Sequence, residues 1–262
     1  MKFTRILILA LGLLATGVIG AGVTYWQLSQ MEEDDFPAAT GFSGNDIASI
    51  EGIVKSYLLA NPEIVRDAFR ELEARDERRR VAEAASLVAD NAEKIFREAG
   101  AIVLGNPEGD ITLVEFTDYN CPFCKRSVAD VKKLIAGDAN LRVVIKEFPI
   151  LGDGSVEAAR VSLAVAKQSR YYEFHQKLFD VRGQKNGAKA LAIAEELGLD
   201  MDKLSADMKS AEVEKTIADT LDLASVLRIQ GTPAFVVGNE IVPGAVGYAA
   251  LADRIAAARK TN

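Results

Sequence analysis

Both cysteines of this 262-residue chain lie in one tetrapeptide, Cys-Pro-Phe-Cys, at positions 121–124. The apolar, β-forming run 111–116 precedes it and the helical pattern 125–136 follows it, so the tetrapeptide marks a strand-to-helix junction. Unpaired backbone N–H groups and the positive end of the helix dipole favour a thiolate at Cys121, where the helix begins. Cys124 lies one helical turn further on, within reach of a disulfide bond. The pattern therefore predicts a redox-active pair.

A disulfide inside this tetrapeptide closes a very small loop, so its role is expected to be chemical rather than structural. Metal binding is the main alternative. Two thiolates supply only half of a tetrahedral zinc shell, and the single histidine, His175, is distant in sequence. The sequence thus predicts no metal and no other cofactor. The net charge of −7 argues against nucleic acid as a partner.

Residues 1–28 predict export of the rest of the chain. Lys2 and Arg5 precede the almost wholly apolar run 6–26, which ends in Tyr25 and Trp26. The run is long enough to span a membrane and has aromatic residues where a membrane interface favours them, which indicates a signal anchor. Small residues within 18–22 leave a cleaved signal peptide as the alternative. Both alternatives keep the two basic residues on the cytoplasmic side.

Two segments separate this region from the cysteine pair. Residues 29–44 are acidic and then contain proline and glycine, which indicates a linker. Residues 45–98 have a helical pattern with an apolar stripe, restarted by Asn61 as an N-cap and Pro62 at the first helical position. The stripe can pack on the following domain or on copies of itself. A helical pattern longer than about 25 residues favours the second, a homo-oligomer.

Residues 99–262 mix strand and helix patterns and indicate an α/β domain. Strands at 111–116 and 141–148 flank the helix 125–136, and such a β-α-β unit predicts parallel strands. A short strand is expected before this unit, at 101–104. The pattern is then helical from 155 to 227. Gly231-Thr232-Pro233 introduces two further strands, at 234–237 and 241–242, and a final helix at 248–260.

This order of elements resembles the thioredoxin-like fold with the helical insertion found in DsbA-family thiol–disulfide oxidoreductases. The resemblance covers residues 101–262. It rests on the Cys121–Cys124 motif together with Glu115, Lys146 and the dipeptide Thr232-Pro233. This combination is far more specific than a C-x-x-C motif alone. The fold class that it implies is α/β, preceded by the N-terminal membrane or signal helix and the helical extension.

Two further details qualify the resemblance. The helical region with Asn61-Pro62-Glu63 is similar to the bacterial branch that includes ScsC and Com1-like proteins, and in some ScsC-type members that region oligomerises. The dipeptide Pro122-Phe123 differs from the Pro-His of the archetypal oxidase. The difference removes a histidine charge from beside Cys121, which puts the strength of oxidation in question.

The resemblance implies roles at the cysteines and at the Thr-Pro dipeptide. Cys121 is the nucleophile, and Cys124 is the resolving thiol of an exchange through a mixed disulfide. Pro233 is expected in cis, which turns the backbone of Thr232 towards Cys121 for pairing with a client strand. Tyr119 is expected at the rim of this site.

Glu115 and Lys146 are the expected supporting pair. A buried, unpaired carboxylate is costly, so Glu115 is expected to pair with Lys146 or to reach Cys124 through water, where it would relay protons. A solvent-facing Glu115 at a strand edge is the alternative. Lys125 and Arg126 are interpreted as surface charges, and His175 as a structural residue.

Together these features predict a periplasmic enzyme that forms or isomerises disulfides in cysteine-containing exported proteins. A membrane redox partner would re-oxidise or reduce it, and residues 1–28 would anchor it to the inner membrane unless they are cleaved. Three alternatives stay open: a disulfide reductase, a thiol-based copper-binding stress protein, and an envelope scaffold built on residues 45–98. Oligomerisation would favour isomerase activity, because several thiolates would surround one client.

Overall fold

The computed structural model describes residues 41–261, and the chain divides into two compact units between Leu72 and Glu73. The predicted segment 1–28 and most of the predicted linker 29–44 lie outside the described residues. Within 41–261, no helix combines the length and the apolar character needed to cross a membrane.

The first unit contains α2 (Gly44–Ala60) and the start of α3 (Glu63–Asp90). Ser43 and Asp46 form a reciprocal capping box at the start of α2. The prediction that Asn61 caps the next helix is wrong: its side-chain Nδ2 donates to the carbonyl of Tyr57 at 2.9 Å. The side-chain amide of Asn61 therefore binds the last turn of α2. Helix α3 begins one residue after Pro62.

A five-stranded sheet forms the centre of the second unit, in the order β1-β3-β2-β4-β5. Its strands are β1 (Ile102–Gly105), β2 (Ile111–Thr117), β3 (Leu141–Glu147), β4 (Ala234–Val237) and β5 (Glu240–Pro243). The pair β2–β3 is parallel, as the β-α-β pattern predicts, and the three other pairs are antiparallel. Both central strands are almost wholly buried, which explains their nearly continuous apolar sequence.

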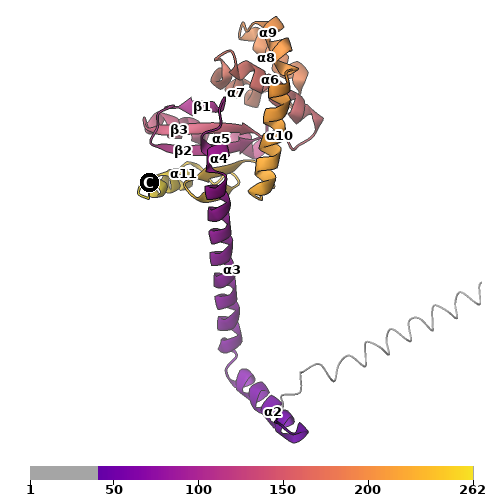
Figure 1. The fold of residues 1–262 in the computed structure, drawn as a ribbon, viewed down its shortest axis with the longest axis vertical. Coiled ribbons are helices and arrows are strands. Elements are labelled where there is room, and N and C mark those ends of the chain that lie inside the picture. Colours follow the sequence, from indigo (N-terminus) through magenta and orange to yellow (C-terminus); the bar gives the residue numbers. More distant parts are fainter. Residues whose placement is uncertain (1–40, 262) are drawn as a thin grey trace, which may run out of the picture. The chain divides into compact units, whose positions relative to one another are not determined.

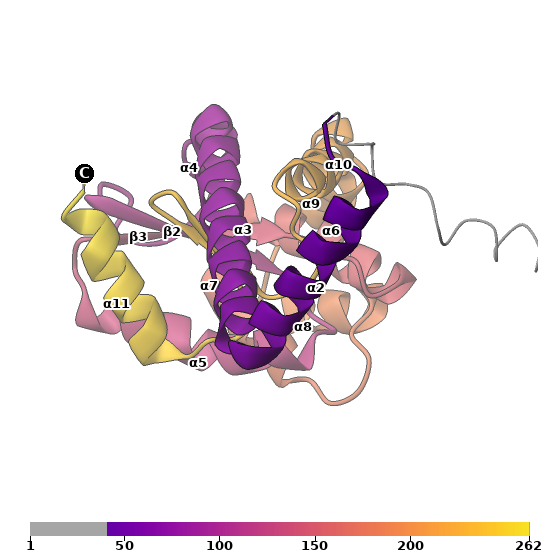
Figure 2. The ribbon, with the colours of Figure 1, turned by 90° about the horizontal axis from the view of Figure 1, so that it is seen from below.

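Helices cover both faces of this sheet. α5 (Pro122–Gly137) and α11 (Tyr248–Arg259) lie next to each other and pack their apolar residues on the face that bears Leu113 (Figure 2). Residues of α4 (Ala92–Phe96) and α10 (Ala211–Val226) pack on the opposite face, which bears Val114. The fold is therefore the thioredoxin-like α/β arrangement that the sequence predicts.

Most of the helical insertion between β3 and β4 lies to one side of the sheet, and its last helix returns along the sheet (Figure 1). It consists of α6 (Asp153–Ala166), α7 (Tyr171–Asp180), α8 (Gly187–Glu196), α9 (Met201–Met208) and α10. A separate apolar cluster fills the space among α6, α7, α8 and α9, and both cysteines belong to that cluster. The redox pair thus lies where the insertion meets the sheet domain.

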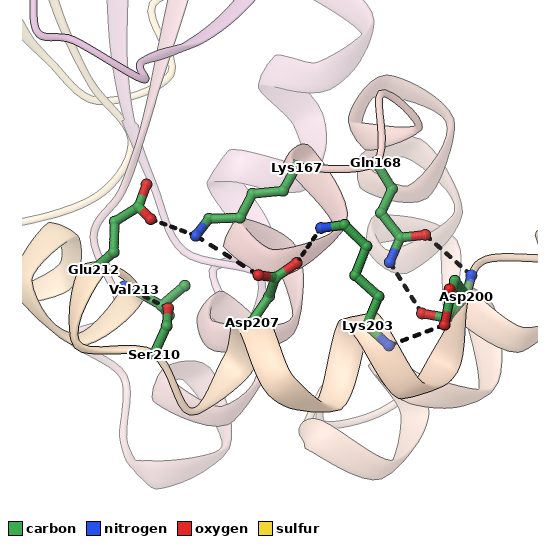
Figure 3. A network of polar contacts seen from close by, with 8 residues as sticks. All are labelled: Lys167, Gln168, Asp200, Lys203, Asp207, Ser210, Glu212 and Val213. Carbon is green, nitrogen blue, oxygen red and sulfur yellow. Dashed lines mark hydrogen bonds and ion pairs between the residues drawn. The ribbon is translucent and has the colours of Figure 1, made fainter.

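Polar contacts on the surface of the insertion tie α6 to α9 and α10 (Figure 3). The ammonium group of Lys167, just after α6, lies 2.5 Å from the Glu212 carboxylate and 3.8 Å from that of Asp207. The side-chain amide of Gln168 both donates to and accepts from the backbone of Asp200, each at 3.0 Å. Exposed ion pairs stabilise a fold weakly, so the buried cluster provides most of the cohesion.

Candidate active site at the start of α5

Cys121 is the N-cap residue of α5, and Pro122 occupies the first helical turn. The Sγ atom of Cys121 accepts a hydrogen bond from the backbone N–H of Cys124 at 3.4 Å. Both cysteines are free thiols, and both are buried, Cys124 completely. A sulfur at an N-cap faces the unpaired N–H groups of the first turn, and these stabilise negative charge on it.

The loop before β4 brings a distant backbone segment to this sulfur. The peptide bond between Thr232 and Pro233 is cis. The carbonyl oxygen of Thr232 lies 3.1 Å from the Sγ atom of Cys121 and accepts a hydrogen bond from its thiol. A backbone carbonyl therefore stands beside the thiol that a client sulfur would approach.

Cys124 lies deeper than Cys121, on the buried side of α5. Burial raises the pKa of its thiol well above the ordinary value, and a negative charge on Glu115 raises it further. The Cys124 thiol is therefore held in its protonated, neutral form. An exchange step that needs the Cys124 thiolate requires a nearby group to take up its proton.

Glu115 is buried on β2, so the alternative of a solvent-facing carboxylate at a sheet edge is wrong. Burial raises its pKa to about 8, and the charge of Glu147 adds to the increase. The protonated form therefore dominates at neutral pH. In its ionised form, which dominates above about pH 8, this carboxyl group is a candidate to receive the proton of Cys124, whose pKa responds to its charge.

The expected pairing of Glu115 with Lys146 is wrong, and the strand register explains why. Glu115 lies beside Ile145 in the parallel β2–β3 pair, whereas Lys146 lies beside Phe116. Because side chains alternate between the two faces of a sheet, Lys146 points to the face opposite Glu115. Its ammonium group pairs there with the Glu98 carboxylate and donates to the carbonyl of Lys94 at 2.8 Å.

A polar cluster around Glu147, which the sequence did not point to, lies on the same face as Glu115. The Oε1 atom of Glu147 accepts hydrogen bonds from the hydroxyls of Ser162, Tyr171 and Tyr119 at 2.7, 2.8 and 2.9 Å. Tyr119 is 1% exposed, so its expected position at the rim of the site is wrong. In the sequence, a single glutamate at the end of an apolar strand indicates such a cluster only weakly, because the tyrosines that bind it lie 24 and 28 residues away along the chain.

Asp118 holds the loop that follows β3 against the turn that leads to Cys121. One oxygen of its buried carboxylate accepts from the backbone N–H groups of Ile150 and Leu151, at 2.9 and 3.0 Å. The other accepts from the Ser155 hydroxyl and from the N–H of Asn120, both at 2.8 Å. The position of that loop is thus fixed through main-chain groups.

A groove of about 730 Å³ adjoins the cysteine pair within the second unit. Phe123, Pro233 and Ile229 contribute to its mainly apolar wall. Phe123 is 51% exposed, and the guanidinium of Arg126 lies 4.6 Å above the centre of its ring. Such a stacking fixes the orientation of an exposed aromatic side chain. The groove offers a mainly apolar surface next to Cys121, and Arg80, Arg126 and Arg228 contribute positive charge to its wall.

The surroundings of Lys125 and the arrangement of possible metal ligands bear on two further predictions from the sequence. Lys125 lies 3.5 Å from the exposed carboxylate of Asp180, a weak surface ion pair as the sequence suggested. Across 41–261, His, Cys, Asp and Glu side chains form no group of three or more that could hold a metal ion.

Two protein-family models match the chain. The model of the DSBA-like thioredoxin domain matches residues 112–256, and that of the copper resistance protein ScsC N-terminal domain matches residues 46–79. Among curated relatives, a Na(+)/H(+) antiporter NhaA 1 of Salinispora arenicola is 28% identical over 158 residues, which is 60% of this chain. The chain spans about a quarter, 24%, of the length of that relative.

Solved structures agree with these matches. A thioredoxin-like oxidoreductase from Silicibacter pomeroyi is 47% identical, with a TM-score of 0.62, and the match covers 64% of this chain and 97% of that one. ScsC of Proteus mirabilis in a transitional conformation is 27% identical, with a TM-score of 0.63, over 84% of this chain and 100% of that one. The chain therefore belongs to the DsbA-like thioredoxin-domain family and carries, ahead of that domain, the N-terminal domain of ScsC-type proteins.

Proposed function

We propose that the chain is a thiol–disulfide oxidoreductase of the bacterial periplasm that forms or isomerises disulfides in exported proteins through Cys121 and Cys124. The observation that carries the proposal is the position of the Cys121 sulfur, at the N-terminus of α5 and 3.1 Å from the Thr232 carbonyl. Membership of the DsbA-like family supports thiol–disulfide exchange as the reaction class. The basic and then apolar residues 1–28 support export, with anchoring to the inner membrane.

In the oxidising direction the enzyme starts with a Cys121–Cys124 disulfide. A client thiolate attacks Cys121, a mixed disulfide forms, and Cys124 leaves as a thiolate that takes up a proton. A second client thiolate then attacks the client sulfur of the mixed disulfide and releases Cys121 as a thiolate. The client loses two electrons and gains a disulfide, while the pair gains two electrons. A membrane redox partner restores the oxidised pair.

The surroundings of Cys121 favour an extended client segment. The Thr232 backbone, at the edge of the groove, presents polar main-chain groups with which such a segment can pair. The apolar wall at Phe123 and Ile229 covers client side chains next to the reacting cysteine. Pro233 lines the groove next to this carbonyl.

Replacing Cys124 by serine is expected to trap clients on the enzyme. The variant keeps the Cys121 nucleophile but lacks the thiol that resolves the mixed disulfide, so covalent adducts accumulate. The measurement is a non-reducing gel of the full chain from a periplasmic extract, with adducts that disappear on reduction.

The matched control is the double variant with serine at both 121 and 124, which should form no adducts. Absence of adducts in Cys124→Ser, together with tight Cu(I) binding by the unmodified protein, would instead support the copper-binding alternative. The observation that favours this second candidate is the match of residues 46–79 to the copper resistance protein ScsC N-terminal domain.

The first unit supports a second part of the proposal, self-association. None of the residues in α2 is buried within the described chain. Large apolar side chains are nevertheless exposed along α2 and the start of α3, among them Ile53, Leu59 and Phe69 at 69%, 73% and 62%. Exposed apolar patches of this kind mark interaction sites, and a second copy of the same region would cover them. A homo-oligomer would bring several Cys121 thiols to one client and so favour isomerisation.

Introducing aspartate at Phe69 is expected to dissociate such an oligomer, because a charge in an apolar interface loses its hydration without gaining a partner. Light scattering coupled to size-exclusion chromatography should show the mass falling to that of one chain, with thiol exchange on a small peptide unchanged. Lys55→Asp, at an exposed polar position of α2, is the control and should keep the larger mass. A monomeric mass for the unmodified protein at all concentrations would refute self-association.

A further inference from the structure

The buried cluster around Glu147 brings together five groups that can carry a proton, on β3, on the turn before α5, on α6 and on α7. Besides their bonds to Glu147, the oxygens of Tyr119 and Tyr171 lie 3.0 and 2.9 Å from Nδ1 of His175. The Tyr119 and Ser162 oxygens are 2.6 Å apart. All of these side chains are buried. Three helix or turn elements therefore converge on one carboxyl group.

The hydroxyl hydrogens in this cluster are too few for all the contacts at once. Each of Tyr119, Tyr171 and Ser162 carries one hydrogen. If all three donate to Glu147, none remains for the short contact between Tyr119 and Ser162. A proton on Glu147 removes this conflict, because one hydroxyl can then turn to another oxygen. The cluster can therefore take up or release one proton at Glu147 by reorienting hydroxyl groups.

The same carboxyl group is a neighbour of the acid that serves Cys124. Thr117 lies beside Glu147 in the β2–β3 register, so Glu115, two residues earlier on the same strand, is its diagonal neighbour on one face. Burial raises the pKa of Glu147 to about 7, while the surrounding hydroxyls restrain the increase. Burial lowers the pKa of His175 to about 3, so its ring stays neutral.

The titratable groups that face Glu147 are Glu115 on β2, Asp118 and Tyr119 on the turn, and Tyr171 and His175 on α7, whereas α6 contributes the neutral hydroxyl of Ser162. Cys124 on α5 interacts with Glu115. Burial raises the pKa of both tyrosines well above the ordinary value and lowers that of His175. The carboxylate of Asp118 is fixed by four hydrogen bonds. Glu115 and Glu147 are the two other carboxyl groups of this set.

We infer that Glu147 is a positioning residue of the exchange reaction, which sets through its charge the pH at which Glu115 accepts the proton of Cys124. The inference rests on the proposed function. In the step concerned, the Cys124 thiol gives its proton to the Glu115 carboxylate. The Cys124 thiolate then attacks Cys121 in the mixed disulfide, the Cys121–Cys124 bond forms, and the client sulfur leaves with the electron pair of the broken bond. The client is reduced and the pair is oxidised.

The direction of the effect follows from the charges. A negative Glu147 disfavours a second negative charge on Glu115 and so keeps Glu115 protonated to a higher pH. Glutamine at 147 removes that charge. Glu115 then loses its proton at lower pH, and the Cys124 step becomes effective at lower pH as well. A shift of about one pH unit corresponds to one charge on a neighbouring strand at an effective dielectric constant of about 20.

The experiment measures how fast Cys124 resolves a preformed mixed disulfide between Cys121 and a fluorescent thiol peptide, by stopped flow in the full chain from pH 5 to pH 10. For the unmodified protein the rate should rise with a midpoint close to the pKa of Glu115, about 8. Glu147→Gln should move the midpoint down by about one unit. Glu157→Gln, the same change at an exposed carboxyl of α6, should leave it in place.

The outcomes separate the two proposals. If the unmodified protein never releases the peptide, the proposed function fails. If it does, but Glu147→Gln has an unchanged midpoint and only a lower rate at every pH, the role of Glu147 is structural and the inference is overturned. Should Glu147→Gln fail to fold, Tyr171→Phe removes one donor that holds Glu147 ionised. It should lower the midpoint by a smaller amount, and an unchanged midpoint there also overturns the inference.

Discussion

Replacing Cys121 by serine is expected to abolish thiol exchange, with a loss of roughly a thousandfold or more, as for the removal of other enzymic nucleophiles. A serine hydroxyl at the N-cap of α5 keeps the hydrogen-bonding position but does not ionise near neutral pH, so no nucleophile remains. The rate of disulfide transfer to a reduced model peptide should fall to that of the peptide alone.

Cys124→Ser provides the contrast for this result. It should form the first mixed disulfide and stop there, because Cys121 is intact. If Cys121→Ser retained the exchange rate while Cys124→Ser lost it, the order of the two thiols would be the reverse of the one that their geometry indicates. Serine is also among the preferred helix N-cap residues, so Cys121→Ser should unfold at a temperature close to that of the reduced parent protein.

Replacing Glu115 by glutamine is expected to stabilise the protein at alkaline pH. The pKa of Glu115 is about 8 in the folded chain, above the value of 4.5 of a free side chain. The folded state thus holds this proton more tightly than the unfolded state does. The contribution of Glu115 to stability is therefore fully present below about pH 4.5 and is lost as the pH rises through 8. The full loss for such a shift is on the order of 5 kcal/mol.

Glutamine is neutral at every pH and avoids this loss. Urea unfolding of the reduced protein should show little difference between Glu115→Gln and its parent at pH 5, and a gain of a few kcal/mol for the variant at pH 9. Glu157→Gln, at an exposed position, should show no gain at either pH. A variant that is equally stabilised at pH 5 and pH 9 would show that the ionisation of Glu115 is not the cause. The variant should also resolve mixed disulfides slowly, since it lacks the proton acceptor for Cys124.

Local sequence signals were sufficient to predict most of the fold. The strands around 111–116 and 141–148 are buried apolar runs, and each later helix carries a regular apolar period, so the elements agree with the prediction to within a few residues. At the cysteine pair the apolar run of a strand gives way to the apolar period of a helix, and this change predicts the start of α5. Asn61 is predicted to cap the following helix, but its side chain binds the end of the preceding one. Its amide can serve either helix, and only the backbone geometry decides between the two.

The contacts around the cysteine pair depend on the register of β2 against β3. No short segment of the sequence specifies that register. Moving Lys146 by one position along β3 would place it on the face of Glu115. In the actual register it meets Glu98, and Glu147, which lies beside Thr117, is the diagonal neighbour of Glu115 on the same face. The partners of Glu147 come from α6, α7 and the turn before α5, 15 to 28 residues away in the chain. Such contacts become visible only when the helical insertion is packed on the sheet.

Asp118 gives the loop after β3 an unusual freedom to change its sequence. It binds that loop through the backbone N–H groups of Ile150 and Leu151, while both side chains point away with 37% and 46% of their surface exposed. Any residue except proline presents the same N–H groups. Substitutions at these two positions can therefore change the exposed surface of this loop, while the Asp118 contacts that hold it against the turn before Cys121 stay constant.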